Sequence, residues 1–577
     1  MQPFNTATFL AMKTNYSLPS VVVALSYDVV YDDYDTIDVS SLIKGIPTVC
    51  ILNFATALEG KTHYQFNYQP SQRNLIFNMC KYLDSNARRR VRKFMSNHSE
   101  VMLISTETLF YVCGLALQNY EPIDSTEKDF LLYEDEFEKV YKAILYFNKK
   151  WTDDQVRGNA MNIIDISLLV DIPIVEFKLY KDFRPQLYKA IQFFIFCSND
   201  THYKNILDLF CTDHNVNDWH EYLLNLFSFY EATLRGQYVR IDKNFPSDKV
   251  FFDQYIIDIN DCHDLVDDHN ALKYFRDHFL YPIKEGIYLP ISPDLLVDKF
   301  YQAIKFDVFK TIQKHNIKRN NGKEYKSLPV FNSELGTNFS EPYLLYTLFE
   351  KIYKGRKDVV MFTGSELKKM NVPEEPDFYL RIGNCVFIFE NKDILFPDMA
   401  KYSGEAKVIK ETIIDKICKY PDASSKGVSR EGFGQIHKSI ENIIDNGLMD
   451  QIDPGIVNVK SVYPVLVSYD KAFSALGVNL TVIEEYQRIL KEHPIKKPIF
   501  ISIPTIMEFD SLLLCAYRLH TKEFDLRKLI MNYLISNQGN LQPFSTYVLD
   551  NPLKNASSSE EENKFLYGDL LKDITIP

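Results

Sequence analysis

The clearest pattern of apolar and polar positions lies between residues 377 and 392. Over residues 377–382, large apolar side chains recur at every second position, which predicts a β-strand. Residues 385–389 are apolar at every position, as in a central strand that is covered on both faces. Gly383 and Asn384 lie between these runs and form a pair that closes two-residue hairpins. The pattern therefore predicts a β-hairpin.

The sequence on either side of this hairpin has mostly helical periodicity. Leu345, Leu348, Phe349 and Ile352 form a stripe that predicts a helix from about Ser340 to residue 354. Ser340 is the expected N-cap and Gly355 the expected stop. The same reasoning predicts strands and helices in the following order: strand 358–362, hairpin 377–392, helix 404–420, helix 435–446 and strand 461–467.

Outside this segment, the pattern is mainly helical from residue 70 to 320, and strands are predicted at 21–25 and 47–52. Residues 314–329 are basic, rich in Asn and poor in apolar residues, which indicates a domain boundary. A strand at 499–503 and helices within 511–534 follow. We therefore expect three regions: a mainly helical recognition or regulatory region with a few strands (1–325), an α/β core (326–475) and a C-terminal α/β extension packing on it (476–577).

Composition adds limits to this picture. The chain has 577 residues, of which 46% are hydrophobic, and its formal charge is −12, so a nucleic-acid partner requires a local basic patch. Nine cysteines without a CxxC pair indicate free thiols in a reducing compartment. No apolar run reaches about 18 residues, and the first residues lack a signal-peptide pattern. We expect a cytoplasmic protein without a membrane span.

Charged residues lie at the open end of the predicted hairpin. Asp377 begins its first strand, and Glu390 and Lys392 end the second. Glu390 and Lys392 are two residues apart, so both point to one face of the sheet. Charges at the end of an apolar strand cost free energy unless they are paired, and a divalent cation with a phosphate would pair them. Mg²⁺ suits such a site because it takes few protein carboxylates and keeps water and phosphate ligands.

Pro376-Asp377 followed by Glu390-Asn391-Lys392 resembles the PD-(D/E)XK nuclease superfamily, and the resemblance covers roughly residues 330–470. It implies a core of helix, three strands, helix and strand with a mixed sheet. It also implies that Asp377 and Glu390 bind Mg²⁺, for which Mn²⁺ substitutes, and that Lys392 serves the attacking water.

Two further site residues follow from the resemblance. Many members supply a third carboxylate from the first helix, here Glu341, although Glu341 equally fits a residue that complements the helix dipole. Many members also place a Gln at the start of the second helix, where this chain has Gln435. The sequence departs from the fuller Gln-x-x-x-Tyr form, because Ser439 stands in the Tyr position.

Two other clusters of charge are present in the N-terminal half. The densest basic run is a candidate nucleic-acid contact or, alternatively, a solvated helix face or an intramolecular partner for the acidic surface; it comprises Arg88, Arg89, Arg90, Arg92 and Lys93. Residues 258–269 contain acids, Cys and His that are potential metal ligands. Their spacing fits no zinc or calcium template, and acids before a helix commonly serve as caps.

These features predict a metal-dependent nuclease that hydrolyses phosphodiester bonds, with DNA favoured over RNA and endonuclease over exonuclease action. The chain has no GxxxxGK[ST], GxGxxG or GxSxG motif, which argues against an ATP-driven motor or a serine hydrolase. A helical module fused to such a nuclease resembles bacterial restriction and anti-phage defence effectors. An activator or partner protein and a homo-oligomer are further expected partners. The alternative is a catalytically silent nuclease fold used for binding or scaffolding.

Overall fold

The computed structural model describes most of the chain. The described residues are 23–63, 68–123, 130–156, 162–175, 182–241, 246–266, 270–421, 429–536, 542–553 and 559–568. The predicted strand at 21–25 therefore lies partly outside the described residues. No helix in these ranges is long and apolar enough to cross a membrane.

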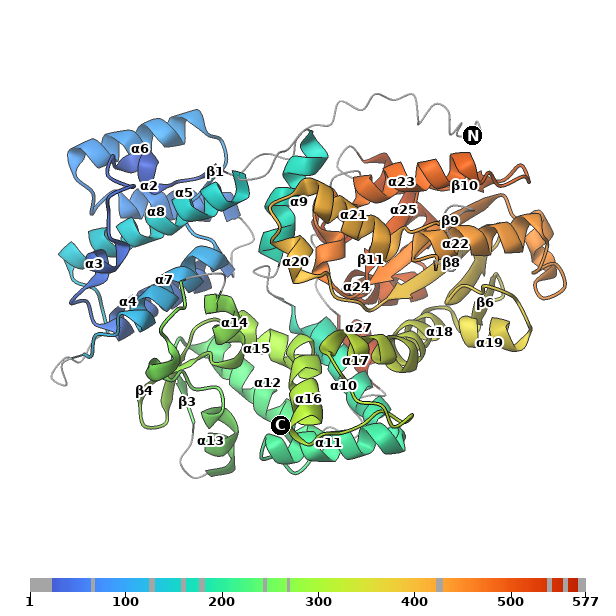
Figure 1. Cartoon of the computed structure of the whole chain (residues 1–577), viewed down its shortest axis with the longest axis horizontal. Coiled ribbons are helices and arrows are strands. Elements are labelled where there is room, and N and C mark those ends of the chain that lie inside the picture. The colour runs from blue at the N-terminus through green and yellow to red at the C-terminus, as the bar shows by residue number, and fades with distance from the viewer. Residues whose placement is uncertain are drawn as a thin grey trace.

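A mixed six-stranded sheet organises the C-terminal half (Figure 1). Its strands are β6 (Val359–Thr363), β7 (Phe378–Ile382), β8 (Cys385–Lys392), β9 (Ser461–Ser468), β10 (Phe500–Ile501) and β11 (Thr505–Glu508). The order is β10-β9-β8-β7-β6, and β11 also pairs with β9. Strands β6, β7 and β8 are antiparallel neighbours, whereas β9 is parallel to β8. The predicted strands at 358–362, 461–467 and 499–503 are thus present.

The predicted hairpin is confirmed as β7 and β8. Ile382 pairs with Cys385 across a loop of two residues. Gly383, the first loop residue, has φ +58°, as a type II′ hairpin turn requires. Strand β8 lies between β7 and β9, which explains why its sequence is apolar on both faces.

Helices cover both faces of the sheet. Phe387 and Phe389 point into one hydrophobic core with helices α18 (Thr347–Tyr353) and α24 (Phe509–His520). Val386 and Ile388 point into a second core. The helices of this second core are α9 (Ile163–Ile174), α21 (Ala406–Ile417), α22 (Phe433–Ile440) and α23 (Val478–Glu492). Helix α9 comes from the N-terminal half, so the expected boundary at residue 325 does not separate the packing units.

The first helix of the core differs from its prediction. Helix α17 (Leu328–Leu335) continues through a π-helical segment, η3 (Gly336–Tyr346), into α18. Ser340 is therefore inside the helix, and the N-cap prediction was wrong. Its hydroxyl donates to Asp393 Oδ2 at 2.5 Å instead. Pro342 indicated a helix start, but the π segment accommodates it in the interior. The stop at Gly355 agrees with the structure, since α18 ends at Tyr353 and Gly355 has φ +79°.

The remaining elements of the C-terminal half are short. They are α19 (Gly364–Lys369), α20 (Asp398–Lys401), η4 (Glu441–Asp445, π-helical), η5 (Pro454–Asn458), η6 (Lys471–Ser474), α25 (Leu526–Ile535), α26 (Phe544–Asp550) and α27 (Glu560–Tyr567). Strands β10 and β11, which follow residue 476, join the central sheet through β9.

The N-terminal half is mainly helical, as predicted. Its helices are α2 (Tyr27–Val30), α3 (Val39–Ile43), α4 (Thr48–His63), α5 (Tyr68–Met79), α6 (Ser85–Asn97), α7 (Thr106–Gln118), α8 (Glu134–Val156), α10 (Phe183–Asn199), α11 (Thr201–Asp213), α12 (Trp219–Arg235), α13 (Pro246–Asp253), η2 (Ile259–Asp261), α14 (Asn270–Asp277), α15 (Pro293–Phe300) and α16 (Gln302–Lys314). Two small sheets comprise β1 (Val23–Ala24) with β2 (Val101–Met102), and β3 (Val239–Arg240), β5 (Ile287–Pro290) and β4 (Leu280–Lys284).

The predicted strand at 47–52 was wrong, because residues 48–52 form the start of α4. A short apolar run fits a buried helix as well as a buried strand, and residues 49–52 are all buried here. Beyond this difference, one continuous hydrophobic core joins the N-terminal helices to one face of the central sheet. The molecule is therefore an α/β structure in which a large helical region packs directly on a mixed sheet.

Candidate functional site

The predicted acidic residues meet at the end of the β7–β8 hairpin. Phe378 pairs with Phe389, so the next step of the antiparallel register brings Asp377 opposite Glu390. The backbone N–H of Asn391 donates to Asp377 Oδ2 at 2.7 Å. Glu390 is 3% exposed. The hairpin thus places the buried carboxylate of Glu390 beside the half-buried carboxylate of Asp377.

Lys392 is held on the same face by three oxygen atoms. Its Nζ lies 3.3 Å from Glu390 Oε1 and 3.0 Å from Glu431 Oε2, and it donates to Gln435 Oε1 at 2.8 Å. Burial opposes the charged form of Lys392, but Glu390 and Glu431 outweigh it and raise the pKa of the ammonium. Lys392 is therefore a fixed positive charge beside the acidic pair.

Gln435 lies where the resemblance implied, at the start of α22. Its Oε1 accepts from Lys392 Nζ and from the backbone N–H of Gly432 at 2.9 Å. Gly432 has φ +55°, a conformation that favours glycine, and it turns the chain into the helix. Gln435 thus joins the helix start to Lys392.

Glu341 reaches this cluster from the π-helical segment η3. The Tyr346 hydroxyl donates to Glu341 Oε2 at 3.3 Å. Burial, followed by the negative charge of Asp377, raises the pKa of Glu341 to about 8. An ordinary α-helix gives residues 341 and 346 different angular positions than a π-helix does. The π segment therefore accounts for the contact of Glu341 with Tyr346, whose ring centre is 5.8 Å from that of Phe378 in β7. Because Glu341 lies inside η3, complementing a helix N-terminus is excluded as its role.

The three acids carry more negative charge than the neighbouring lysine balances. Burial raises the pKa of Asp377 to about 6. Burial and the charge of Asp377 raise the pKa of Glu390 well above its usual range. Raised pKa values show that the folded protein disfavours the ionised carboxylates. A bound cation would relieve this repulsion.

The site would offer Mg²⁺ only a small number of protein ligands. Within the described ranges, no three His, Cys, Asp or Glu side chains are grouped closely enough to hold a metal ion. Mg²⁺ is commonly bound through one or two carboxylates and completes its shell with water and phosphate. Asp377 and Glu390 meet that requirement, and Glu341 lies within electrostatic reach of Asp377.

The loop before Asp377 is held by α22 and its continuation. Ser439 donates its hydroxyl to the carbonyl of Glu374 at 2.8 Å, and Asn442 donates to the carbonyl of Pro373 at 3.1 Å. Glu374 has φ +50°, which is unusual for a residue with a side chain. Ser439, where the resemblance would place a Tyr, therefore supports the loop that leads to Asp377.

Two site residues were missed by the sequence reasoning. Glu431 directly precedes Gly432, outside helix α22, so no helical count places it beside Gln435, and the sequence carried no signal for its contact with Lys392. Tyr346 follows Glu341 by five residues, a spacing that indicates contact only in a π-helix. Its role could not be found from an α-helical pattern.

The predicted basic run does not join this site. Helix α6 carries it at the left of the molecule in Figure 1, whereas β8 and α22 lie at the right. Arg90 forms a bidentate pair with Asp32 at 2.7 and 2.6 Å. Arg88 donates to the carbonyl of Leu83, and Arg89 donates to Asn86. Arg92 and Lys93 are exposed, so they are the members most available to a partner.

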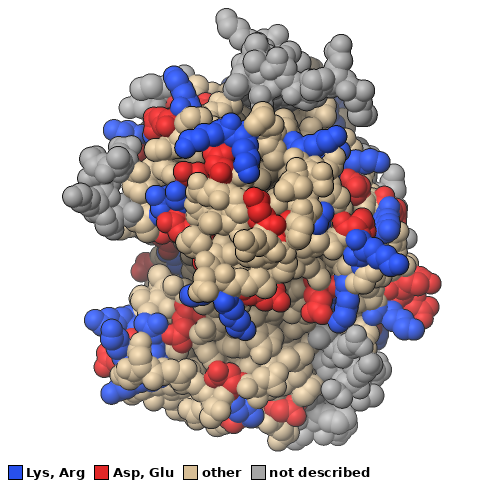
Figure 2. All heavy atoms as spheres, turned by 90° about the vertical axis from the view of Figure 1, so that its right-hand side faces the viewer, with Lys and Arg blue, Asp and Glu red and all other residues tan. Residues whose placement is uncertain are grey.

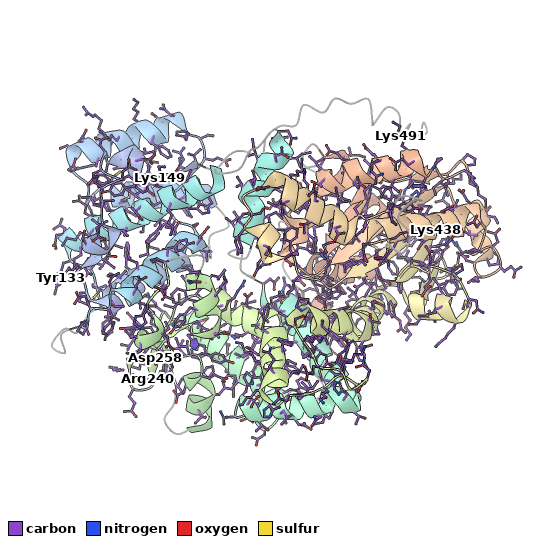
Figure 3. All side chains as sticks on the ribbon, in the orientation of Figure 1. Tyr133, Lys149, Arg240, Asp258, Lys438 and Lys491 are labelled. Atoms are coloured by element: carbon purple, nitrogen blue, oxygen red, sulfur yellow. The ribbon has the colours of Figure 1, made fainter. Side chains whose placement is uncertain are left out.

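The acidic run at residues 258–269 is also separate. Asp258 is far from Lys438 of α22 in Figure 3. Its carboxylate caps the short helix η2 by accepting from the Asn260 N–H at 2.9 Å. Residues 267–269 lie outside the described residues. Helix capping therefore explains the position of Asp258, the first acid of the run.

Surface charge shows no single basic field on the face drawn in Figure 2, where Lys and Arg are interspersed with Asp and Glu. Lys314 and Arg319, from the basic segment at 314–329, are paired with Asp213 at 2.6 Å and Glu334 at 2.7 Å. The segment therefore carries less unpaired positive charge than its sequence indicates.

Comparison of the chain with protein-family models, curated proteins and solved structures found no significant match.

Proposed function

We propose that this protein is a Mg²⁺-dependent nuclease with its active site at the end of the β7–β8 hairpin. The observation that carries the proposal is the fixed ammonium of Lys392 beside the buried Glu390 and the half-buried Asp377. Phosphodiester hydrolysis passes through a state with increased negative charge. A cation and a held ammonium stabilise that charge electrostatically.

Each residue has a distinct part in this proposal. Asp377 and Glu390 would hold Mg²⁺, with Mn²⁺ as a substitute, and Glu341 would add negative charge from η3. When bound, the ion would polarise the phosphate and lower the pKa of a water molecule. Lys392 orients that water or stabilises the developing charge, and Gln435 and Glu431 hold its ammonium in place.

We infer the substrate and the cellular setting from the resemblance and from the composition of the chain. DNA is favoured over RNA, and internal cleavage over removal of ends. The free, mostly buried cysteines fit a reducing, cytoplasmic compartment. The large helical region would recognise a partner, activator or second copy, a layout similar to restriction and anti-phage defence effectors. Arg92 and Lys93 on α6 would contact nucleic acid outside the active site.

The test is cleavage of supercoiled plasmid and of single-stranded DNA with Mg²⁺, with Mn²⁺ or with EDTA. Wild type is compared with Lys392→Ala and with Lys438→Ala. Lys438 is a matched control because it is on the same helix as Gln435 but pairs with Glu441 at 2.8 Å. We expect metal-dependent cutting that Lys392→Ala abolishes and Lys438→Ala retains.

The competing function is a nuclease fold kept for binding or scaffolding. It is favoured if folded wild type cuts neither DNA nor RNA and neither Mg²⁺ nor Mn²⁺ binds in a calorimetric titration. Metal binding that Asp377→Ala removes, without cutting, would instead indicate a nuclease that requires an activator.

A further inference from the structure

A buried ion pair connects the helical region to the two segments that carry the candidate site. Lys305, from α16, donates to both carboxylate oxygens of Asp393, at 2.6 and 2.9 Å. The Ser340 hydroxyl donates to the same carboxylate at 2.5 Å. Exposed fractions are 3% for Lys305, 6% for Asp393 and 0% for Ser340. One ammonium and one hydroxyl thus satisfy a buried carboxylate.

Asp393 and Ser340 are each adjacent in sequence to a residue of the candidate site. Asp393 directly follows Lys392, and Ser340 directly precedes Glu341. The carboxylate of Asp393 therefore ties the end of β8 to the π segment η3. A second tie runs in parallel: the Tyr469 hydroxyl donates to Asn391 Oδ1 at 2.9 Å and lies 3.4 Å from the carbonyl of Ser340.

Lys305 differs from the other members of this cluster because it comes from outside the nuclease-like segment. It is supplied by helix α16 of the N-terminal helical region. Its Nζ also lies 5.1 Å from the centre of the ring of Tyr301, which belongs to the same region. A buried carboxylate that loses its cation is strongly disfavoured. The junction of β8 and η3 therefore depends on the placement of α16.

We infer that Lys305 is a positioning residue for the candidate site, through which the helical region sets the relative position of Lys392 and Glu341. This inference rests on the proposed function for its catalytic consequence. It gives α16 a specific role, because a partner that shifts α16 would alter the site without touching it.

The test compares Lys305→Met with Lys299→Met in the full-length protein. Lys299 is a matched control, since it is 2% exposed and pairs with Asp307 at 3.1 Å but contacts neither β8 nor η3 through that pair. Both variants lose a buried ammonium, so a general loss of stability affects both. Ser340→Ala is the milder second variant, because it removes one hydroxyl and keeps the ion pair.

Two readouts separate positioning from stability. Hydrogen exchange measures the order of residues 340–346 and 390–393, and kinetics with Mg²⁺ and plasmid DNA separates kcat from KM. Lys305→Met and Ser340→Ala are expected to increase exchange in both segments. They should also lower kcat by about 10- to 100-fold, as loss of an outer-shell partner does, with little change in KM. Lys299→Met should leave both segments protected.

Unchanged exchange in both segments for Ser340→Ala, and for Lys305→Met relative to Lys299→Met, would overturn the inference. So would a kcat equal to that of the control. If wild type cuts no DNA and binds no metal, the proposed function fails. The exchange comparison still decides whether Lys305 orders the junction. If Lys305→Met does not fold, Lys305→Gln replaces it in the same comparison, because it removes the charge and keeps a hydrogen-bond donor toward Asp393.

Discussion

Pairs of acids, each with one buried member, occur in two parts of this molecule under opposite electrostatic conditions. At the hairpin end, Asp377 and Glu390 share one nearby lysine, Lys392, which is also paired with Glu431. In the helical region, Asp277 and Asp307 are both paired with Lys299, at 3.3 and 3.1 Å, and with Lys310, at 2.8 and 3.4 Å. The first set has too few cations, and the second has as many lysines as acids.

The pKa directions follow this balance. Burial acts on both sets and by itself raises the pKa of a carboxyl group. Lys299 and Lys310 outweigh burial and lower the pKa of Asp277. Lys392 does not outweigh it, so the pKa of Asp377 is raised to about 6. A balanced cluster stabilises the fold, whereas a surplus of buried negative charge is costly and indicates a site for a cation.

Removing the central cation of the balanced cluster should have the largest effect on stability. Lys299→Met leaves the buried Asp307 and its neighbour Asp277 with Lys310 alone. We expect the free energy of unfolding to fall by roughly 3–5 kcal/mol, measured by urea unfolding at neutral pH. The matched control is Lys310→Met, because this lysine joins the same acids but its side chain is 56% exposed, so its loss should cost less than about 1 kcal/mol. Equal losses would contradict the assignment of Lys299 as the centre.

The two clusters should respond to pH in opposite directions. The raised pKa values of Glu341 (about 8) and Asp377 (about 6) mean that the folded protein retains protons that the unfolded chain releases above about pH 4. Their contribution is fully present below that pH and is lost as pH rises through 6 and 8. We expect the metal-free protein to lose roughly 3 kcal/mol or more over this range, since each unit by which a carboxyl pKa is raised is worth about 1.4 kcal/mol. Unfolding of wild type and Glu341→Gln from pH 4 to 8 measures it.

Asp277→Asn is the control for this pH prediction. Because the pKa of Asp277 is lowered, its contribution is present above its ordinary pKa and is lost as pH falls. Subtracting variant from wild type should therefore give a falling slope for Glu341 above about pH 4 and a slope of opposite sign for Asp277 below about pH 4, where unfolding is also measured. Saturating Mg²⁺ should flatten the slope that Glu341→Gln removes and leave the Asp277 slope unchanged. Slopes of the same sign would contradict the comparison.

The sequence predicted the elements of the sheet better than the contacts among them. Local periodicity was sufficient for β7, β8 and β9 because these strands are rich in apolar residues and the hairpin turn residues are specific. It was insufficient for Lys305 and Asp393, which are 88 residues apart and meet only through tertiary packing. It also failed for η3, because α-helical and π-helical segments have similar compositions and Pro342 favoured a helix start. The nuclease assignment itself stays a prediction.

The smallest effect we predict comes from the strand that carries Asp377. Gly364 N–H donates to the carbonyl of Asp377 at 2.8 Å, and a Cβ on Gly364 would lie 3.0 Å from the Pro376 carbonyl oxygen and 3.2 Å from the Asp377 Cα. Because these atoms are backbone, Gly364→Ala must displace Asp377, at a cost of about 1–2 kcal/mol. We expect weaker Mg²⁺ binding in a calorimetric titration together with this modest loss of stability.

The control for this substitution is Gly336→Ala in the preceding helix. Gly336 has helical φ and ψ of −51° and −55° and open space around a Cβ, so alanine there should stabilise the protein by about 0.4–1 kcal/mol. Metal binding should not change in that variant. If Gly364→Ala binds Mg²⁺ as wild type does, then Asp377 is not held by the close approach of these two backbones. The position of Asp377 would then be set by Ser439 of α22 and Asn442 of η4, which donate hydrogen bonds to the loop before it.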